Sequence, residues 1–149
     1  MKQSVMAGLL FLLGATVVGA PAGQKPETLA EMKVRAAGTP PNECVRLCVG
    51  IARRALEEAK DRYGKGADDE GKLLLRDMET YADEAADAVI RSKKHEKELE
   101  IALRDISHHL EALKRELSPE DQPAAAAAIG HLEKLRTRLL ESMFGKGKR

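Results

Sequence analysis

Apolar residues recur every three or four positions through most of this 149-residue chain, and this spacing predicts amphipathic helices. The first strong segment runs from Asn42 to Tyr63. Its small and apolar residues gather on one face of a helix, while charged residues lie opposite. The expected buried face consists of Cys44, Val45, Cys48, Ile51, Ala52, Ala55, Leu56 and Ala59. Gly64 and Gly66 should end this helix, since glycine is common at helix C-termini.

A heptad pattern dominates the stretch from Asp68 to Leu117. Alternating steps of three and four residues select thirteen positions, and eleven of these are apolar. The apolar positions are Leu75, Met78, Ala82, Ala85, Val89, Leu99, Leu103, Ile106, Leu110, Leu113 and Leu117. The two polar positions are Ser92 and Glu96, in a segment, residues 91–98, that contains no apolar side chain.

The polar gap at residues 91–98 permits two interpretations. We expect a single helix of about 48 residues, because the gap holds no Gly or Pro and the heptad phase is the same on both sides. The alternative is a chain reversal, with Lys93 and Lys94 at a helix C-terminus and Glu96 and Glu98 at a new N-terminus. The first interpretation gives a helical hairpin or three-helix bundle with a long central helix. The second gives a four-helix up-down bundle.

The last helix should begin at Ser118 or Asp121 and end at Gly145. Ser118 suits an N-cap, but Pro123 has no N–H to donate and therefore favours a bent or delayed start. The apolar stripe of this helix consists of Ala125, Ala128, Leu132, Leu135, Leu139 and Met143.

Residues 23–41 contain three prolines and are expected to form a flexible linker or arm. A short helix around Glu27–Ala36 fits within this arm and would place Leu29 and Met32 on one side. We therefore expect an all-α protein in which a helical bundle domain over residues 42–144 is followed by a basic tail over residues 145–149.

The first 22 residues have the layout of a secretory signal peptide. Lys2 precedes an apolar run from Val5 to Gly19, and small residues continue to Ala22, where we expect cleavage. The run is short for a membrane span. The mature chain of about 127 residues would be a single exported domain, periplasmic or secreted.

Composition narrows the function further. Without Lys2, the remaining 24 Lys and Arg balance 24 Asp and Glu, which excludes the strongly basic footprint of most nucleic-acid binders. Aromatic residues make up only 3% of the sequence, so Leu and Ala must build the core. Such a core is typical of packed helices, whereas enclosed ligand pockets usually have more aromatic lining.

Cys44 and Cys48 are the one pair of residues with evident chemistry. Their spacing places both sulfurs on the apolar face of the first helix, and export would place them in an oxidising compartment. Three interpretations stay open: buried thiols that act as small hydrophobic groups, intermolecular disulfides in an antiparallel dimer, and a local bridge or soft-metal site. A regular helix disfavours the local bridge because its Cβ vectors are parallel. Two thiolates alone leave Zn²⁺ short of four protein ligands.

The histidines are expected to be solvated, since His108 and His109 would point away from the apolar face of their helix or lie on its flank. The sequence contains no motif of a hydrolase, a zinc protease, a P-loop or a dinucleotide site. We assign no catalytic residue, no cofactor and no metal ligand from the sequence, and we expect no enzyme.

The expected function is that of an exported, non-enzymatic interaction module of the cell envelope, acting by oligomerisation, as an adaptor or by chaperone-like binding. A continuous helix would leave part of its apolar heptad stripe uncovered, which favours self-association or another envelope protein as partner. One alternative is a reversible binder of lipid or membrane surfaces, although scarce aromatics argue against it. The other is a thiol-dependent metal or redox protein that uses Cys44 and Cys48.

Overall fold

The computed structural model describes residue 23 and residues 25–145. The expected signal peptide and residues 146–149 of the basic tail lie outside the described residues. Residues 25–145 contain helices and no strand. Their elements are α1 (Leu29–Ala37), the 3₁₀-helix η1 (Pro41–Glu43), α2 (Val45–Gly64), α3 (Asp68–Ser92), α4 (Glu96–Glu116) and α5 (Gln122–Phe144).

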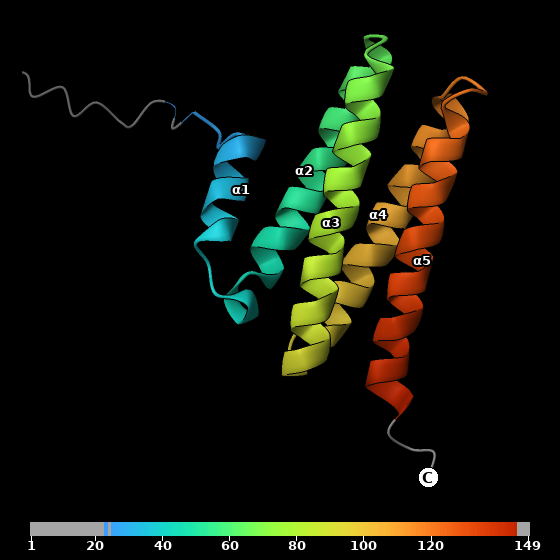
Figure 1. Ribbon diagram of the computed structural model, residues 1–149. Helices are drawn as coiled ribbons and strands as arrows, with labels where there is room; N and C mark the ends of the chain where they lie inside the picture. Colours follow the sequence, from blue (N-terminus) through green and yellow to red (C-terminus); the bar gives the residue numbers. More distant parts are fainter. Residues whose placement is uncertain (1–22, 24, 146–149) are drawn as a thin grey trace, which may run out of the picture.

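Two antiparallel hairpins, α2 with α3 and α4 with α5, lie side by side (Figure 1). Across the interface between the hairpins, α2 contacts α4 and α3 contacts α5. The helices of each of these two pairs run in the same direction. The expected all-α bundle is confirmed, and its architecture is the four-helix alternative with the short helix α1 added beside α2.

The expected continuous helix through residues 91–98 is wrong. α3 ends at Ser92 and α4 begins at Glu96, because Lys93 (φ 59°) and His95 (φ 63°) both adopt left-handed backbone conformations. Left-handed residues end a right-handed helix and reverse the chain. The heptad phase is nevertheless the same on both sides, and both stripes are buried in the core, so a shared phase does not require a continuous helix.

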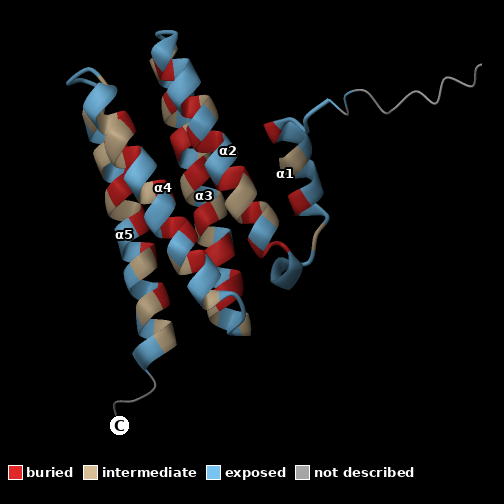
Figure 2. Ribbon diagram, turned by 180° about the vertical axis from the view of Figure 1, so that it is seen from behind, coloured by how far each residue is buried: buried red, intermediate tan, exposed pale blue. Residues whose placement is uncertain are grey.

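The expected apolar faces are buried, and buried residues line the inward sides of the helices (Figure 2). All eight residues expected on the buried face of the first helix are at most 6% exposed. Of the eleven apolar heptad residues, ten are buried and Leu117 is half-buried. The heptad stripe is therefore used inside the bundle. Within residues 25–145, the large apolar side chains that remain exposed lie on four different helices: Val34, Leu73, Ile101 and Phe144.

The two helix starts that contain proline differ from one another. α2 begins at Val45 rather than Asn42, because η1 precedes it and makes Cys44 the N-cap residue. The delayed start expected for the last helix is confirmed, since α5 begins at Gln122.

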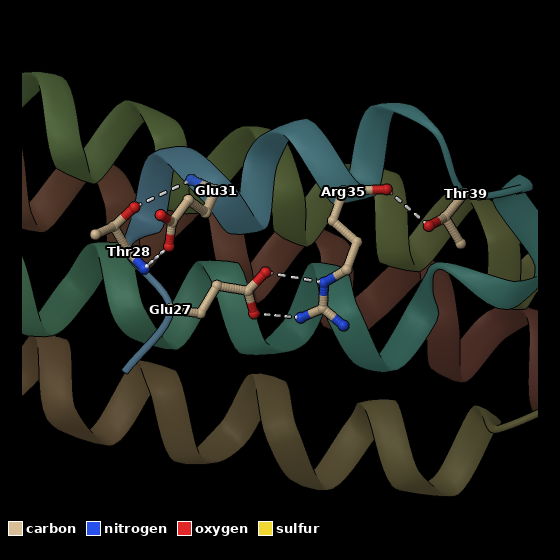
Figure 3. A network of polar contacts seen from close by, with 5 residues as sticks. All are labelled: Glu27, Thr28, Glu31, Arg35 and Thr39. Atoms are coloured by element: carbon tan, nitrogen blue, oxygen red, sulfur yellow. Dashed lines mark hydrogen bonds and ion pairs between the residues drawn. The ribbon is translucent and has the colours of Figure 1, made fainter. Parts of the chain in front are cut away.

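The expected short helix in the arm is confirmed as α1. A capping box between Thr28 and Glu31 begins it, and Arg35 makes two hydrogen bonds with Glu27, at 3.0 and 2.6 Å (Figure 3). Leu29 is 7% exposed, and Lys33 forms an ion pair with Asp77 of α3. This part of the arm is therefore a helix packed on the first hairpin, and it forms one wall of the site described next.

Candidate functional site

Cys44, Cys48 and Glu84 converge near the start of α2. Cys44 is the N-cap of α2, Cys48 lies one turn further, and Glu84 belongs to α3. The two Sγ atoms lie 2.6 Å apart, and the Cys48 thiol donates to Glu84 Oε2 at 3.8 Å. The three ligand atoms all lie within 4.8 Å of one another. In the described part of the chain, this is the one group of three or more His, Cys, Asp or Glu residues that converges so closely.

The thiols form part of the wall of a pocket of about 370 Å³. Cys44 is 6% exposed and Cys48 is 1% exposed, while Glu84 is exposed. The lining comes from α1, the segment that follows it, α2 and α3, and comprises Ala36, Ala37, Thr39, Pro41, Cys44, Cys48, Glu84, Asp87 and Arg91. The site therefore combines two buried sulfurs, one solvated carboxylate and an adjoining space that water or a small molecule can enter.

The surroundings of Cys48 favour its protonated thiol. Burial raises the pKa of the Cys48 thiol, and its hydrogen bond with Cys44 and the charge of nearby Glu84 raise it further. Burial also raises the pKa of Tyr81, with a smaller contribution from the charge of Glu84. The other carboxylate of the pocket, Asp87, is paired with Arg138 at 2.9 Å.

The expected placement of both sulfurs on the apolar face of α2 is confirmed. Both cysteines are free. Cys44 stands at the junction of η1 and α2 with helical dihedral angles (φ −81°, ψ −12°), and its carbonyl accepts from the Cys48 N–H at 2.7 Å, so the two cysteines share the backbone geometry of a helical i,i+4 pair. The separation of 2.6 Å between the sulfurs is only about 0.5 Å longer than a disulfide bond.

Glu84 is the residue of this site that sequence reasoning missed, although the sequence contains a usable signal. Gly66 occupies the turn between α2 and α3, and Cys48 and Glu84 both lie 18 positions from it. Residues equidistant from the turn of an antiparallel hairpin lie level with each other. The ion pair between Arg62 and Glu70, each four positions from Gly66, has the same register (3.2 Å).

The histidines do not join this site. His95, His108 and His109 are exposed, as expected. His131 is half-buried, contrary to the expectation that it is fully solvated, and its Nε2 lies 2.8 Å from Asp83 Oδ1 of α3.

A separate groove of about 330 Å³ runs between α2 and α4. Its apolar lining includes Val45, Val49, Leu99, Ala102 and Ile101, of which Ile101 is 46% exposed. Two ion pairs connect the same helices, Arg46 with Glu98 at 3.2 Å and Arg53 with Asp105 at 3.4 Å.

Comparison with known proteins finds no matching family model, no similar curated protein and no similar solved structure. No helix within residues 25–145 is both long enough and apolar enough to cross a membrane.

Proposed function

We propose that this protein is an exported, non-enzymatic helical bundle that binds a thiophilic divalent cation, of the class of Zn²⁺ or Cd²⁺. Cys44, Cys48 and Glu84 are the proposed ligands. The observation that carries the proposal is the convergence of their three ligand atoms within 4.8 Å at the wall of a pocket. The sequence favoured an interaction module because part of the heptad stripe was expected to be uncovered, but that stripe is largely buried in the bundle. The thiol site therefore supports a function better than the stripe does.

The ligand set selects among cations by softness and by charge. Thiolates prefer Zn²⁺, Cd²⁺ and similar ions to Mg²⁺ or Ca²⁺, which prefer oxygen ligands. Two thiolates and one carboxylate carry three negative charges, of which a divalent cation neutralises two. Arg91 on the pocket wall lies where it can offset the remaining charge. Zinc and cadmium favour four ligands, and a water molecule in the pocket can supply the fourth.

Binding requires a small rearrangement and the release of protons. Tetrahedral coordination with bonds of 2.3 Å separates two sulfurs by about 3.7 Å, so the thiols must move apart by about 1 Å. The Cys44 side chain makes no capping hydrogen bond, so no such contact holds its sulfur beside Cys48. The cysteines must lose their protons to bind as thiolates, and the raised pKa of Cys48 opposes this loss. Affinity should therefore fall as the pH is lowered.

Titration of the purified, reduced protein with Cd²⁺ tests the proposal. We expect one Cd²⁺ per chain and the ultraviolet charge-transfer absorption of cadmium–thiolate bonds. Cys44→Ser and Cys48→Ser should each weaken this absorption, and the double variant should abolish it. Glu84→Gln should lower the affinity by about tenfold or more.

Asp87→Asn is the matched control, because Asp87 lines the same pocket but does not belong to the ligand group. It should leave the affinity unchanged. Cadmium–thiolate absorption that survives in the double cysteine variant, or a reduced wild-type protein that binds no Cd²⁺, would overturn the proposal.

The α2–α4 groove supports a second candidate function, the interaction module expected from the sequence. We propose a second copy of the chain as its occupant, because Ile101 is half-exposed in an apolar groove between charged rims. Light scattering at increasing concentration should then show dimers. Ile101→Glu should dissociate them, whereas Leu73→Glu, at an exposed position on α3, should not. A monomer at every concentration contradicts this second candidate.

Export rests on the sequence of residues 1–22. N-terminal sequencing of the protein recovered from the cell envelope or the medium should find Gly23 as the first residue. Recovery from the cytoplasm with Met1 intact would contradict export.

A further inference from the structure

We infer that Cys44 and Cys48 close into an intramolecular disulfide under oxidation, and that this bond excludes the cation from the site. The inference rests on the proposed function, because it assigns a regulation to the same three residues. The dithiol form of the protein would bind the cation, and the disulfide form would not.

Geometry favours a bond within one chain. The two sulfurs lie 2.6 Å apart and need to approach by only about 0.5 Å. Cys44 is the first residue of this helical turn, so any adjustment that closes the bond is confined to the start of α2. The sequence contains no third cysteine that could compete.

Burial opposes the intermolecular disulfides that the sequence left open. Cys44 is 6% exposed and Cys48 is 1% exposed, and the end of α1 and the first residue of η1 line the same pocket. The sulfurs of a second copy would have to displace these elements, whereas a small-molecule disulfide can reach the thiols through the pocket.

The oxidation proceeds by two thiol–disulfide exchanges with a small-molecule disulfide such as oxidised glutathione. The Cys44 thiolate, on the more exposed sulfur, attacks the small molecule, forms a mixed disulfide and expels one thiolate. The Cys48 sulfur then attacks the Cys44 sulfur of the mixed disulfide and expels the second thiolate. The protein loses two electrons and two protons, and one small-molecule disulfide becomes two thiols.

Glu84 is a positioning residue for the second exchange. Its Oε2 accepts the Cys48 thiol proton at 3.8 Å and can take that proton as the new sulfur–sulfur bond forms.

The cation and the disulfide compete for the same atoms. The internal bond removes two of the three ligands and leaves Glu84 alone, which is too few for a thiophilic cation. Conversely, a bound cation holds the sulfurs about 3.7 Å apart and withdraws both thiolates from exchange.

The test compares the reduced protein with protein treated with oxidised glutathione. We expect the treated wild type to be a monomer on a non-reducing gel and to weigh two hydrogens less than the reduced form. It should show no cadmium–thiolate absorption until a phosphine reductant restores it. Preloading with Cd²⁺ should slow the oxidation.

Two variants report on the order of events. Cys48→Ser should stop at a mixed disulfide on Cys44. Glu84→Gln removes the acceptor of the Cys48 thiol proton and should slow the closure, so that the mixed disulfide of the otherwise intact pair accumulates, whereas Asp87→Asn should close as the wild type does. Unchanged closure in Glu84→Gln would overturn the role assigned to Glu84.

Failure of the inference is distinguishable from failure of the proposed function. A covalent dimer, a stable mixed disulfide in the wild type, or an oxidised protein that binds Cd²⁺ like the reduced one overturns the inference alone. A reduced protein that binds no Cd²⁺ overturns the proposed function and, with it, the metal-excluding role of the disulfide.

Discussion

One substitution in the turn between α3 and α4 should stabilise or destabilise the protein depending on whether the helix reverses there. Lys93 has a φ of 59°, a left-handed conformation that the Cβ atom of an L-residue disfavours. Glycine adopts this conformation without a steric penalty. We therefore expect Lys93→Gly to stabilise the protein, although glycine inserted within a helix ordinarily destabilises it.

The expected gain follows from two opposing terms. Removing the left-handed penalty contributes about 1–2 kcal/mol, and the greater freedom of glycine in the unfolded chain costs about 0.5–1 kcal/mol. The exposed contact of the Lys93 ammonium with Ser142 on α5 is also lost, at a cost of about a few tenths of a kcal/mol. The net effect is a gain of roughly 0.5 kcal/mol. In a continuous helix through residues 91–98, the same substitution would cost about 1 kcal/mol.

Urea unfolding followed by circular dichroism measures this difference. With an m-value of about 2 kcal/mol/M, the midpoint should rise by roughly 0.25 M, with m unchanged. Lys94→Gly is the matched control, because Lys94 lies in the same turn without a positive φ, and it should lower the midpoint. If Lys93→Gly destabilises the protein as much as Lys94→Gly, the reversal at Lys93 is refuted.

Three further predictions concern packing and ionisation, each measured by urea unfolding. Gly71→Ala should destabilise the protein by about 1 kcal/mol, because the new Cβ would lie 2.7 Å from the Tyr63 ring. This overpacking outweighs the gain in helix propensity. In a Tyr63→Leu background the destabilisation should be smaller. The Tyr63 hydroxyl is buried without a hydrogen-bond partner, so Tyr63→Phe should stabilise by about 1 kcal/mol. Burial first, and then the charges of Asp121 and Asp68, raise the pKa of Tyr63 from 10 to about 12. The wild type should therefore lose stability as the pH rises from 10 to 12, whereas Tyr63→Phe should not. A Tyr63→Phe variant that loses as much stability over this range contradicts the assignment. Burial raises the pKa of Glu79 above its ordinary value of 4.5, so the stability that the protonated carboxyl provides at low pH is lost as the pH rises. Glu79→Gln should therefore be more stable than the wild type at pH 7 but not at pH 4.

The residues that face the core could be predicted from the sequence, because burial alone produces their periodicity. The turn at residues 93–95 was predicted only as the alternative, because Lys93 is not a residue type that marks a left-handed turn and the segment contains no Gly or Pro. The heptad phase shared by α3 and α4 was the wrong criterion for a continuous helix. The apolar stripes show that both segments face a core, and two antiparallel helices can do so as well as one long helix.

The four-residue spacing of Cys44 and Cys48 could be seen in the sequence, whereas the chemistry of the pair depends on the register of α2 against α3. Cys48 and Glu84 are level because the α2–α3 turn is centred near Gly66, and a shift of one residue would rotate Glu84 by about 100° around the axis of α3. The hydrophobic pattern of both helices fixes that register, since the same shift would rotate Ala85 and Val89 out of the core. The packing that buries the thiols therefore also sets the carboxylate beside them. This coupling makes Glu84→Gln more informative than either cysteine variant, because it changes the chemistry of the site at an exposed position and leaves the buried packing intact.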